Sequence, residues 1–348
     1  MSTLTIALAS LGGVVLAGVV AHGAWQARKA GPKRAVPGPE RAEPREPVMD
    51  LEGDAPAVAD DALVAPPDRR VNRRIVNRLD ALIDAIAPLR IEAPVSGAMV
   101  LVHLPTTRRA GGKPFLIEGL NAESGDWEAP ANGQRYGEFQ AGVQLANRTG
   151  PLNEIEYSEF VQKVQAFADG VGAMADFPDM LEAVASAREL DAFASQHDAQ
   201  LAVHLQARSA AWSVGYILQH AGRHGFVPGV VPGRLVLPAP EEGAPPVLTL
   251  TFDSQAALAD DPNLAALRDV ILSFDVPQTD AGAAPFVAWQ ASAQALSLGM
   301  DASIVDDHGR ALTPQGFSAI GAELGQLYIA LQERDLAAGS AAARRLFS

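Results

Sequence analysis

Apolar and polar positions follow two different periods in the C-terminal part of the chain. Short apolar or alternating runs indicate strands, and longer segments whose apolar residues recur at helical spacing indicate helices. Beyond residue 198 the two patterns follow one another in a regular order. They predict strands at 199–205, 234–238, 247–252, 268–276 and 302–307, and helices at 209–225, 285–300 and 313–333.

The preceding segment shows a looser version of the same pattern. Apolar residues recur at helical spacing from Val71 to Ile86 and Pro88 follows, which predicts a first helix that ends before this proline. Further strands are predicted at 89–94, 113–119 and 136–146, and further helices at 96–104, 153–174 and 178–197.

Both segments contain a long strand, a proline-containing turn and an amphipathic helix in the same order. We therefore expect an α+β fold with mainly antiparallel sheets and helices on one face, built from two related halves. The halves span 71–198 and 199–335, and residues 336–348 are left as a short tail. A common origin predicts that residues 89–197 superpose on 199–333.

The N-terminus has the pattern of a membrane anchor. Residues 2–27 contain no Asp, Glu, Lys or Arg, and a bilayer core about 30 Å thick needs roughly 20 such residues as a helix. A cleaved signal peptide is the alternative, but the basic residues follow the apolar run and do not precede it. The positive-inside rule then predicts a single-pass anchor at 1–27 with the N-terminus outside and the rest in the cytoplasm.

Residues 28–70 are rich in proline, alanine and charges of both signs, without hydrophobic periodicity. Such a composition predicts a disordered linker whose coil dimensions are about 35–40 Å, so the folded part stays close to the membrane. Residues 81–348 contain 16 basic and 31 acidic side chains. This acidic surplus argues against nucleic-acid binding and favours a basic segment of a protein partner.

The stretch 303–314, SIVDDHGRALTP, places Asp306, Asp307 and His308 side by side and raises the question of an active site. Thr313 and Pro314 have the pattern of a helix start, so the acidic residues and Gly309 fall in a strand-to-helix turn. An acid–base or metal site needs further ligands from elsewhere, and the sequence shows none at a recognisable spacing. The turn interpretation is favoured.

Other patterns give weaker indications of chemistry. His220 and His224 have zinc-helix spacing but lack the glutamate of the metalloprotease pattern, and 108–115, RRAGGKPF, departs from a phosphate loop. The doublets Arg73-Arg74 and Arg344-Arg345 are expected to be solvated. The chain has no cysteine, which excludes disulfides and thiolate chemistry. We expect no catalytic residues, no metal and no cofactor, and thus not an enzyme.

The layout and local sequence together resemble the ZipA family of bacterial cell division proteins. The shared features are an N-terminal membrane helix, a proline-rich charged linker and a terminal α+β domain. Residues 267–317 and 209–229 are similar to the family in their order of elements, including the DD and TPQ motifs. Residues 71–198 have no counterpart in the best-known members and are the main departure.

The resemblance implies an inner-membrane protein whose sheet has one face free of helices. In the family this face is a shallow apolar groove for the C-terminal tail of FtsZ, which binds partly as a helix. A slip of one residue in the alignment around 231–252 would invert the face of each side chain. The positions that carry over are Val231, Leu235, Thr249, Thr251, Ile271 and Ser273.

Several of these positions are small and polar where the family has large apolar side chains. Because each buried apolar anchor stabilises an interface by roughly 1.5–3 kcal/mol, tail binding should be weaker unless the acidic field or the first half contributes. Three functions therefore stay open: an FtsZ tether, a membrane-anchored adaptor for another division or cell-wall partner, and an anchored hydrolase around Asp306, Asp307 and His308.

Overall fold

The structure is a computed structural model that describes residues 78–348 except 242, 259–260 and 262–265. Residues 69–348 belong to one compact unit. The predicted anchor at 1–27, the linker at 28–70 and most of the predicted first helix lie outside the described residues. Among the helices of the described part, none combines the length and the apolar character needed to cross a membrane.

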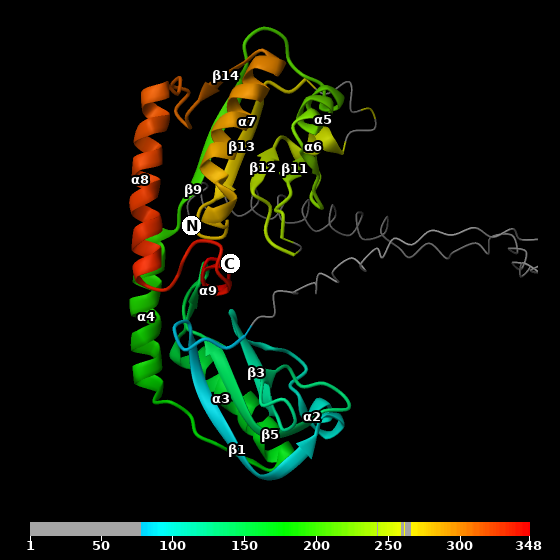
Figure 1. The fold of residues 1–348 in the computed structure, drawn as a ribbon, viewed down its shortest axis with the longest axis vertical. Coiled ribbons are helices and arrows are strands. Elements are labelled where there is room, and N and C mark those ends of the chain that lie inside the picture. Colours follow the sequence, from blue (N-terminus) through cyan, green and yellow to red (C-terminus); the bar gives the residue numbers. More distant parts are fainter. Residues whose placement is uncertain (1–77, 242, 259–260, 262–265) are drawn as a thin grey trace, which may run out of the picture. The chain divides into compact units, whose positions relative to one another are not determined.

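The first half contains a sheet with strand order β2-β3-β5-β1-β8, in which all neighbours are antiparallel (Figure 1). Helix α3 packs on one face of this sheet through aromatic contacts of Phe160 with Phe115 and Phe167 with Phe139. The elements are β1 (Asp84–Ser96), α2 (Gly97–His103), β2 (Arg109–Ala110), β3 (Lys113–Asn121), β4 (Trp127–Glu128), β5 (Arg135–Gln144), β6 (Ala146–Asn147), β7 (Gly150–Pro151), α3 (Glu154–Val171), β8 (Ala173–Ala175) and α4 (Met180–His197).

The second half contains an antiparallel sheet of order β10-β11-β12-β13-β9-β14. Helix α7 covers one face: its Trp289 packs against Phe274 and Phe317 and donates its indole N–H to the Leu272 carbonyl. The elements are β9 (Gln200–Ala207), α5 (Val214–Arg223), β10 (Val227–Pro228), β11 (Arg234–Leu237), β12 (Leu248–Thr251), α6 (Ser254–Ala257), β13 (Asp269–Asp275), α7 (Pro285–Met300), β14 (Ala302–Val305) and α8 (Pro314–Glu333).

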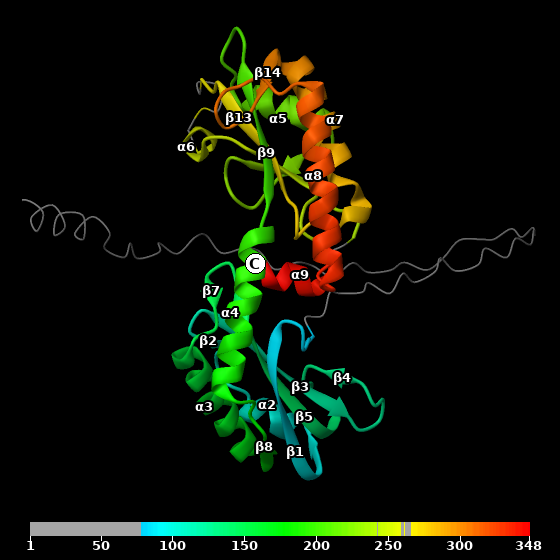
Figure 2. The ribbon, with the colours of Figure 1, turned by 90° about the vertical axis from the view of Figure 1, so that its left-hand side faces the viewer.

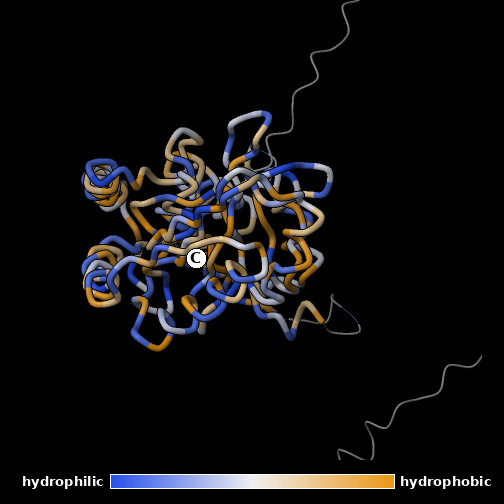
Figure 3. Tube along the Cα trace, turned by 90° about the horizontal axis from the view of Figure 1, so that it is seen from below, coloured by the Kyte–Doolittle hydropathy of each residue, from blue (hydrophilic) through white to orange (hydrophobic). Residues whose placement is uncertain are grey.

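The α+β class and the antiparallel sheets are thus confirmed. The two sheets also share a strand order once β4 and β10 are left out. In each half the first strand along the chain lies between the fourth and the fifth, as β1 lies between β5 and β8, and β9 between β13 and β14. In both halves the long helix, α3 or α7, precedes the strand at one edge, and a second long helix follows that strand. Hydrophilic and hydrophobic residues are interspersed along the trace (Figure 3), as elements that pack on a core with one side require.

The predicted helix before Pro88 is wrong in its described part, because β1 begins at Asp84. Ile83, Ala85, Ala87 and Leu89 alternate into the core, where all four are buried. The alternation of a strand is hidden in the sequence because the inward positions include alanines while Ile86 is apolar on the other side. The other predicted helices and strands are present; α5 starts late because Trp212 pairs with Leu267.

The C-terminal residues are part of the first half's core. The segment 336–348, separated as a tail, contains α9 (Ala341–Leu346), which lies next to the C-terminal part of α4 (Figure 2) and contacts β6. The expectation that Arg344-Arg345 is solvated is wrong. The Arg344 side chain is 14% exposed and lies 3.6 Å from Glu241. Arg345 is 8% exposed and paired with buried Asp84 at 2.5 and 2.8 Å. Burial raises the pKa of Asp84, although Arg345 opposes this shift. The last helix therefore closes the first half.

Candidate functional site

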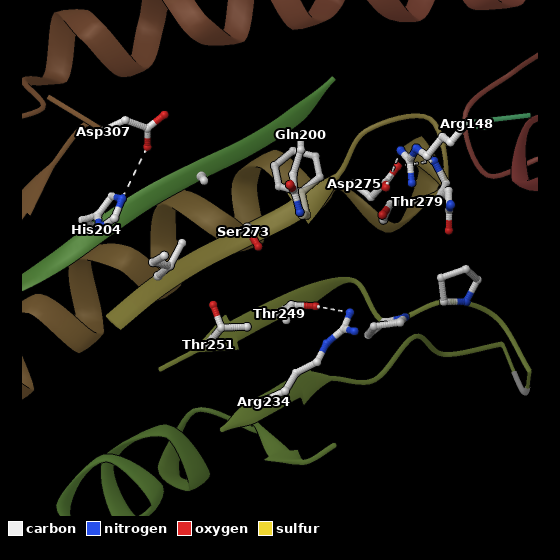
Figure 4. Close-up of a pocket in the computed structure, with 16 residues that line it drawn as sticks. Arg148, Gln200, His204, Arg234, Thr249, Thr251, Ser273, Asp275, Thr279 and Asp307 are labelled. Atoms are coloured by element: carbon white, nitrogen blue, oxygen red, sulfur yellow. Dashed lines mark hydrogen bonds and ion pairs between the residues drawn. The ribbon is translucent and has the colours of Figure 1, made fainter. Parts of the chain in front are cut away.

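The face of the second sheet away from α7 holds a cavity of about 620 Å³ (Figure 4). Its lining residues all come from strands and loops, because alternate residues of β9, β12 and β13 point away from the helix-covered core. The core side takes Val270, Leu272 and Phe274, and Phe274 also borders the cavity. The cavity side takes Gln200, Ala202, His204, Thr249, Thr251, Ile271, Ser273 and Asp275, with Arg148, Arg234, Pro245, Pro246, Gln278, Thr279 and Asp307 around them.

Four of the six positions carried over from the family lie in this cavity, namely Thr249, Thr251, Ile271 and Ser273. The expectation for Leu235 is wrong: it pairs with Leu250, is 3% exposed and belongs to the core on the helix-covered face. Its neighbours Arg234 and Val236 are the residues in register with Thr251 and Thr249. A slip of one residue along β11 accounts for the error.

Val231 does not line the cavity. It lies in the turn before β11 and is 54% exposed, next to the fully exposed Val230. No residue of β9 was predicted to line the site, although Gln200 and His204 do so. These polar residues alternate with buried Val203 and Leu205. That alternation was a readable signal for the residues that were missed.

The wall of the cavity is polar for a peptide groove. Thr249 and Ser273 are buried at 9% and 6% exposure, and half-buried Ile271 lies between Thr251 and His204 in the strand register. The Thr279 hydroxyl is buried and has no hydrogen-bond partner among the described residues. Small polar side chains from the positions carried over therefore line this cavity, and they present hydroxyl groups to it.

The first half supplies one end of the cavity through Arg148, between β6 and β7. Its guanidinium bonds both carboxylate oxygens of Asp198, at 2.5 and 2.8 Å, and lies 2.7 Å from Asp275. The hydrogen bond that Arg148 donates to Asp198 is the main cause that raises the pKa of Arg148, and burial raises the pKa of Asp275 despite the nearby guanidinium. Arg148 is therefore a fixed, neutralised part of the wall.

At the opposite end His204 stands between two carboxylates. Its Nδ1 lies 2.8 Å from Asp269 and its Nε2 lies 3.4 Å from Asp307, which is 78% exposed. Such a contact orients an imidazole. In the part of the chain that the structure describes, no group of three His, Asp or Glu residues is arranged to hold a metal ion.

The turn interpretation of 303–314 is confirmed in its geometry. Asp306 accepts hydrogen bonds from the backbone N–H groups of His308 and Arg310 and from the Arg310 side chain. These bonds, the backbone bond from Arg310 first, lower the pKa of Asp306. Gly309 has φ +74°, and the Thr313 hydroxyl caps α8 by accepting from the Gly316 N–H. The Asp306 carboxylate is therefore used in hydrogen bonds within the turn, whereas Asp307 lines the rim of the cavity.

The other patterns also find structural explanations. The amides of Gly111 and Gly112 donate to Glu159 and Glu156, so this loop binds carboxylates of its own chain where a phosphate loop would offer free amides. The neighbouring Lys113 is buried, and burial lowers its pKa while it donates to Asn147 and Thr149. The His220 ring lies against the Tyr216 ring, 4.3 Å between centroids and tilted by 38°.

Comparisons with known proteins add no identification. No protein-family model matches this chain, and a search of curated proteins returned no match.

Proposed function

We propose that this chain is a ZipA-like cell division protein that tethers FtsZ filaments to the inner membrane. The tail of FtsZ would bind in the cavity on the open face of the second sheet, and residues 1–27 would anchor the chain with its C-terminal domain in the cytoplasm. The observation that carries the proposal is the cavity itself, because four positions taken from the resemblance line it. Binding alone is proposed, without chemistry or a cofactor.

The physical basis is the free face of an antiparallel sheet. One face of such a sheet packs on the core and the other stays available, and a groove there can take an amphipathic segment. Here Ile271 supplies apolar contact, while Thr249, Thr251 and Ser273 supply hydroxyl groups. A net hydrogen bond contributes only about 0.5–1.5 kcal/mol, so we expect an affinity weaker than that of a groove with large apolar anchors.

The first half extends this platform in our proposal. Arg148 is the contact that supports the idea, since it lines the cavity and comes from a segment without counterpart in the best-known family members. We further propose that the two halves are related copies of one ZipA-like unit, on the basis of their common strand order. Superposition of 89–197 on 199–333 by structure alone tests the relationship.

The tether proposal is tested by calorimetric titration of an FtsZ C-terminal tail peptide into residues 69–348, which form one compact unit. A fragment that ends at 335 is unsuitable because α9 and Arg345 belong to the core of the first half. We expect saturable binding that weakens as salt rises. No heat of binding at millimolar peptide would exclude the tether.

A second candidate is favoured by the polar wall. A membrane-anchored adaptor for a different division or cell-wall partner would use the same cavity with other side chains. Pull-down with the full chain separates the two: recovery of FtsZ supports the tether, and recovery of another such protein without FtsZ supports the adaptor.

A further inference from the structure

Charges of opposite sign lie at the two ends of one row of residues across the open face. The strand register places Arg234 on β11 opposite Thr251 on β12, Thr251 opposite Ile271 on β13, and Ile271 opposite His204 on β9. His204 contacts Asp307. Because strands are about 4.8 Å apart, three steps separate the cationic end from the acidic end by about 14 Å.

Arg234 differs from the other arginine of the cavity. Arg148 is held by two carboxylates, whereas Arg234 has no ion-pair partner among the described residues and bonds only the Thr249 hydroxyl, at 3.3 Å. Arg234 is an exposed residue of the short strand β11, which lies next to the edge strand β10. Residues 81–348 contain 31 acidic side chains against 16 basic ones, so Arg234 is a local positive charge in a region whose net charge is negative.

Asp307 is the corresponding free group at the other end. Its neighbour Asp306 is consumed by the turn, but Asp307 is 78% exposed and has only the 3.4 Å contact with His204. Between the two ends Thr251 and Ile271 are half-buried and line the cavity. Room for a bound backbone therefore lies between a cation and an anion (Figure 4).

We propose that the partner segment carries an acidic and a basic side chain that bind Arg234 and the Asp307–His204 pair, and so fix its position across the strands. This inference rests on the proposed function, because it specifies the chemistry of the segment in that same cavity. A span of about 14 Å corresponds to two to three turns of a helix or about four residues of extended chain. The paired charges set the register of the segment, and Ile271 supplies the apolar contact between them.

The test is charge reversal with rescue, measured by fluorescence anisotropy of a labelled FtsZ tail peptide with the full chain in detergent micelles. We expect Arg234→Glu to weaken binding about tenfold and Asp307→Lys about three- to fivefold, since each places like charges together. Arg223→Glu and Glu323→Lys are matched controls, because both residues are exposed and outside the cavity. The controls should stay within twofold.

Rescue identifies the contact. A tail peptide in which one acidic residue is replaced by lysine should bind Arg234→Glu better than it binds the wild type. If all four charge-reversal variants bind the tail peptide as tightly as the unchanged chain does, the inference is overturned and the tether proposal is unaffected. Loss of binding in the Arg223 control equal to that in Arg234→Glu would also overturn it, since a general field would then explain the effect.

A second probe separates this inference from the tether. An alanine-rich helical peptide carries one Glu and one Lys eleven residues apart, and its matched control carries Gln at both positions. If the FtsZ tail does not bind at all, the tether proposal fails. The charge row, from Arg234 to the Asp307–His204 pair, is still supported if the charged peptide binds better than its control and Arg234→Glu abolishes this preference. Equal or absent binding of the two peptides would then overturn the charge row as well.

Discussion

The two sheets have the same strand order, but their helix-free faces differ in what covers them. On the first sheet, Leu79 lies over Gly142, and its N–H donates to Glu118, which also accepts from Gln140. The same face carries Asp84, which binds Arg345 from α9. On the second sheet the corresponding strands line a cavity of about 620 Å³.

The difference shows how one architecture serves two purposes. In the first half, residues from both ends of the described chain cover the sheet face and satisfy its buried polar groups, so this face contributes to stability. In the second half, Thr279 keeps an unpartnered hydroxyl and Arg234 lacks an ion pair within the described residues. A face with unsatisfied groups is the better candidate for binding another molecule.

The largest effect is expected when the first face loses its buried ion pair. Arg345→Ala leaves Asp84 buried without its cation, and we expect the free energy of unfolding to fall by about 3–5 kcal/mol. Arg344→Ala is the control, because its partner Glu241 is exposed and 3.6 Å away; the loss should be under about 1 kcal/mol. Urea unfolding measures both, and equal losses would mean that α9 does not hold this face.

Filling the second face should affect binding more than stability. Thr251→Phe places a ring in the cavity, so we expect the affinity for the tail peptide to fall at least tenfold, about 1.4 kcal/mol, with a smaller change in unfolding. Leu116→Phe, on the open face of the first sheet in register with Gly142, should leave the affinity unchanged. Titration of both variants decides, and equal loss of affinity would remove the distinction between the faces.

A smaller effect is expected from Gly142→Ala. A Cβ at this position would lie 2.5 Å from Leu79 Cδ2, at the end of a flexible side chain, so unfolding free energy should fall by about 1 kcal/mol. Gly137 is the matched control on the same strand, because a Cβ there meets no atom within 4 Å. Thermal unfolding of the pair tests whether Leu79 covers the first face; no difference between them would contradict it.

Part of the second face could be predicted from the sequence, and the reasons for the misses are physical. The apolar pattern predicted the strands that line the cavity, and the resemblance placed Thr249, Thr251, Ile271 and Ser273 on the cavity side. Leu235 was not, because a single-residue slip inverts a strand. The burial of α9 depends on Asp84, which lies 261 positions from Arg345, and local sequence carries no sign of that pairing.

The smallest effect concerns the turn at Asp306, in the second half but outside the cavity. Its folded pKa is lowered, so its contribution to stability is present above the ordinary value of 3.8 and is lost as the pH falls through the lower folded pKa. Asp306→Asn should remove this part of the pH dependence. Acid titration of the unfolding free energy measures the effect, and parallel curves for Asp306→Asn and the unchanged chain would contradict the turn interpretation.

The most direct test of the central claim is an amide NMR titration of the FtsZ tail peptide into residues 69–348. We expect shifts at Ala202, Thr249, Thr251, Ile271 and Ser273, which line the open face of the second sheet, and none at Gln140 and Gly142 on the first. Shifts confined to the first sheet, or an unchanged spectrum at saturating peptide, would contradict the account.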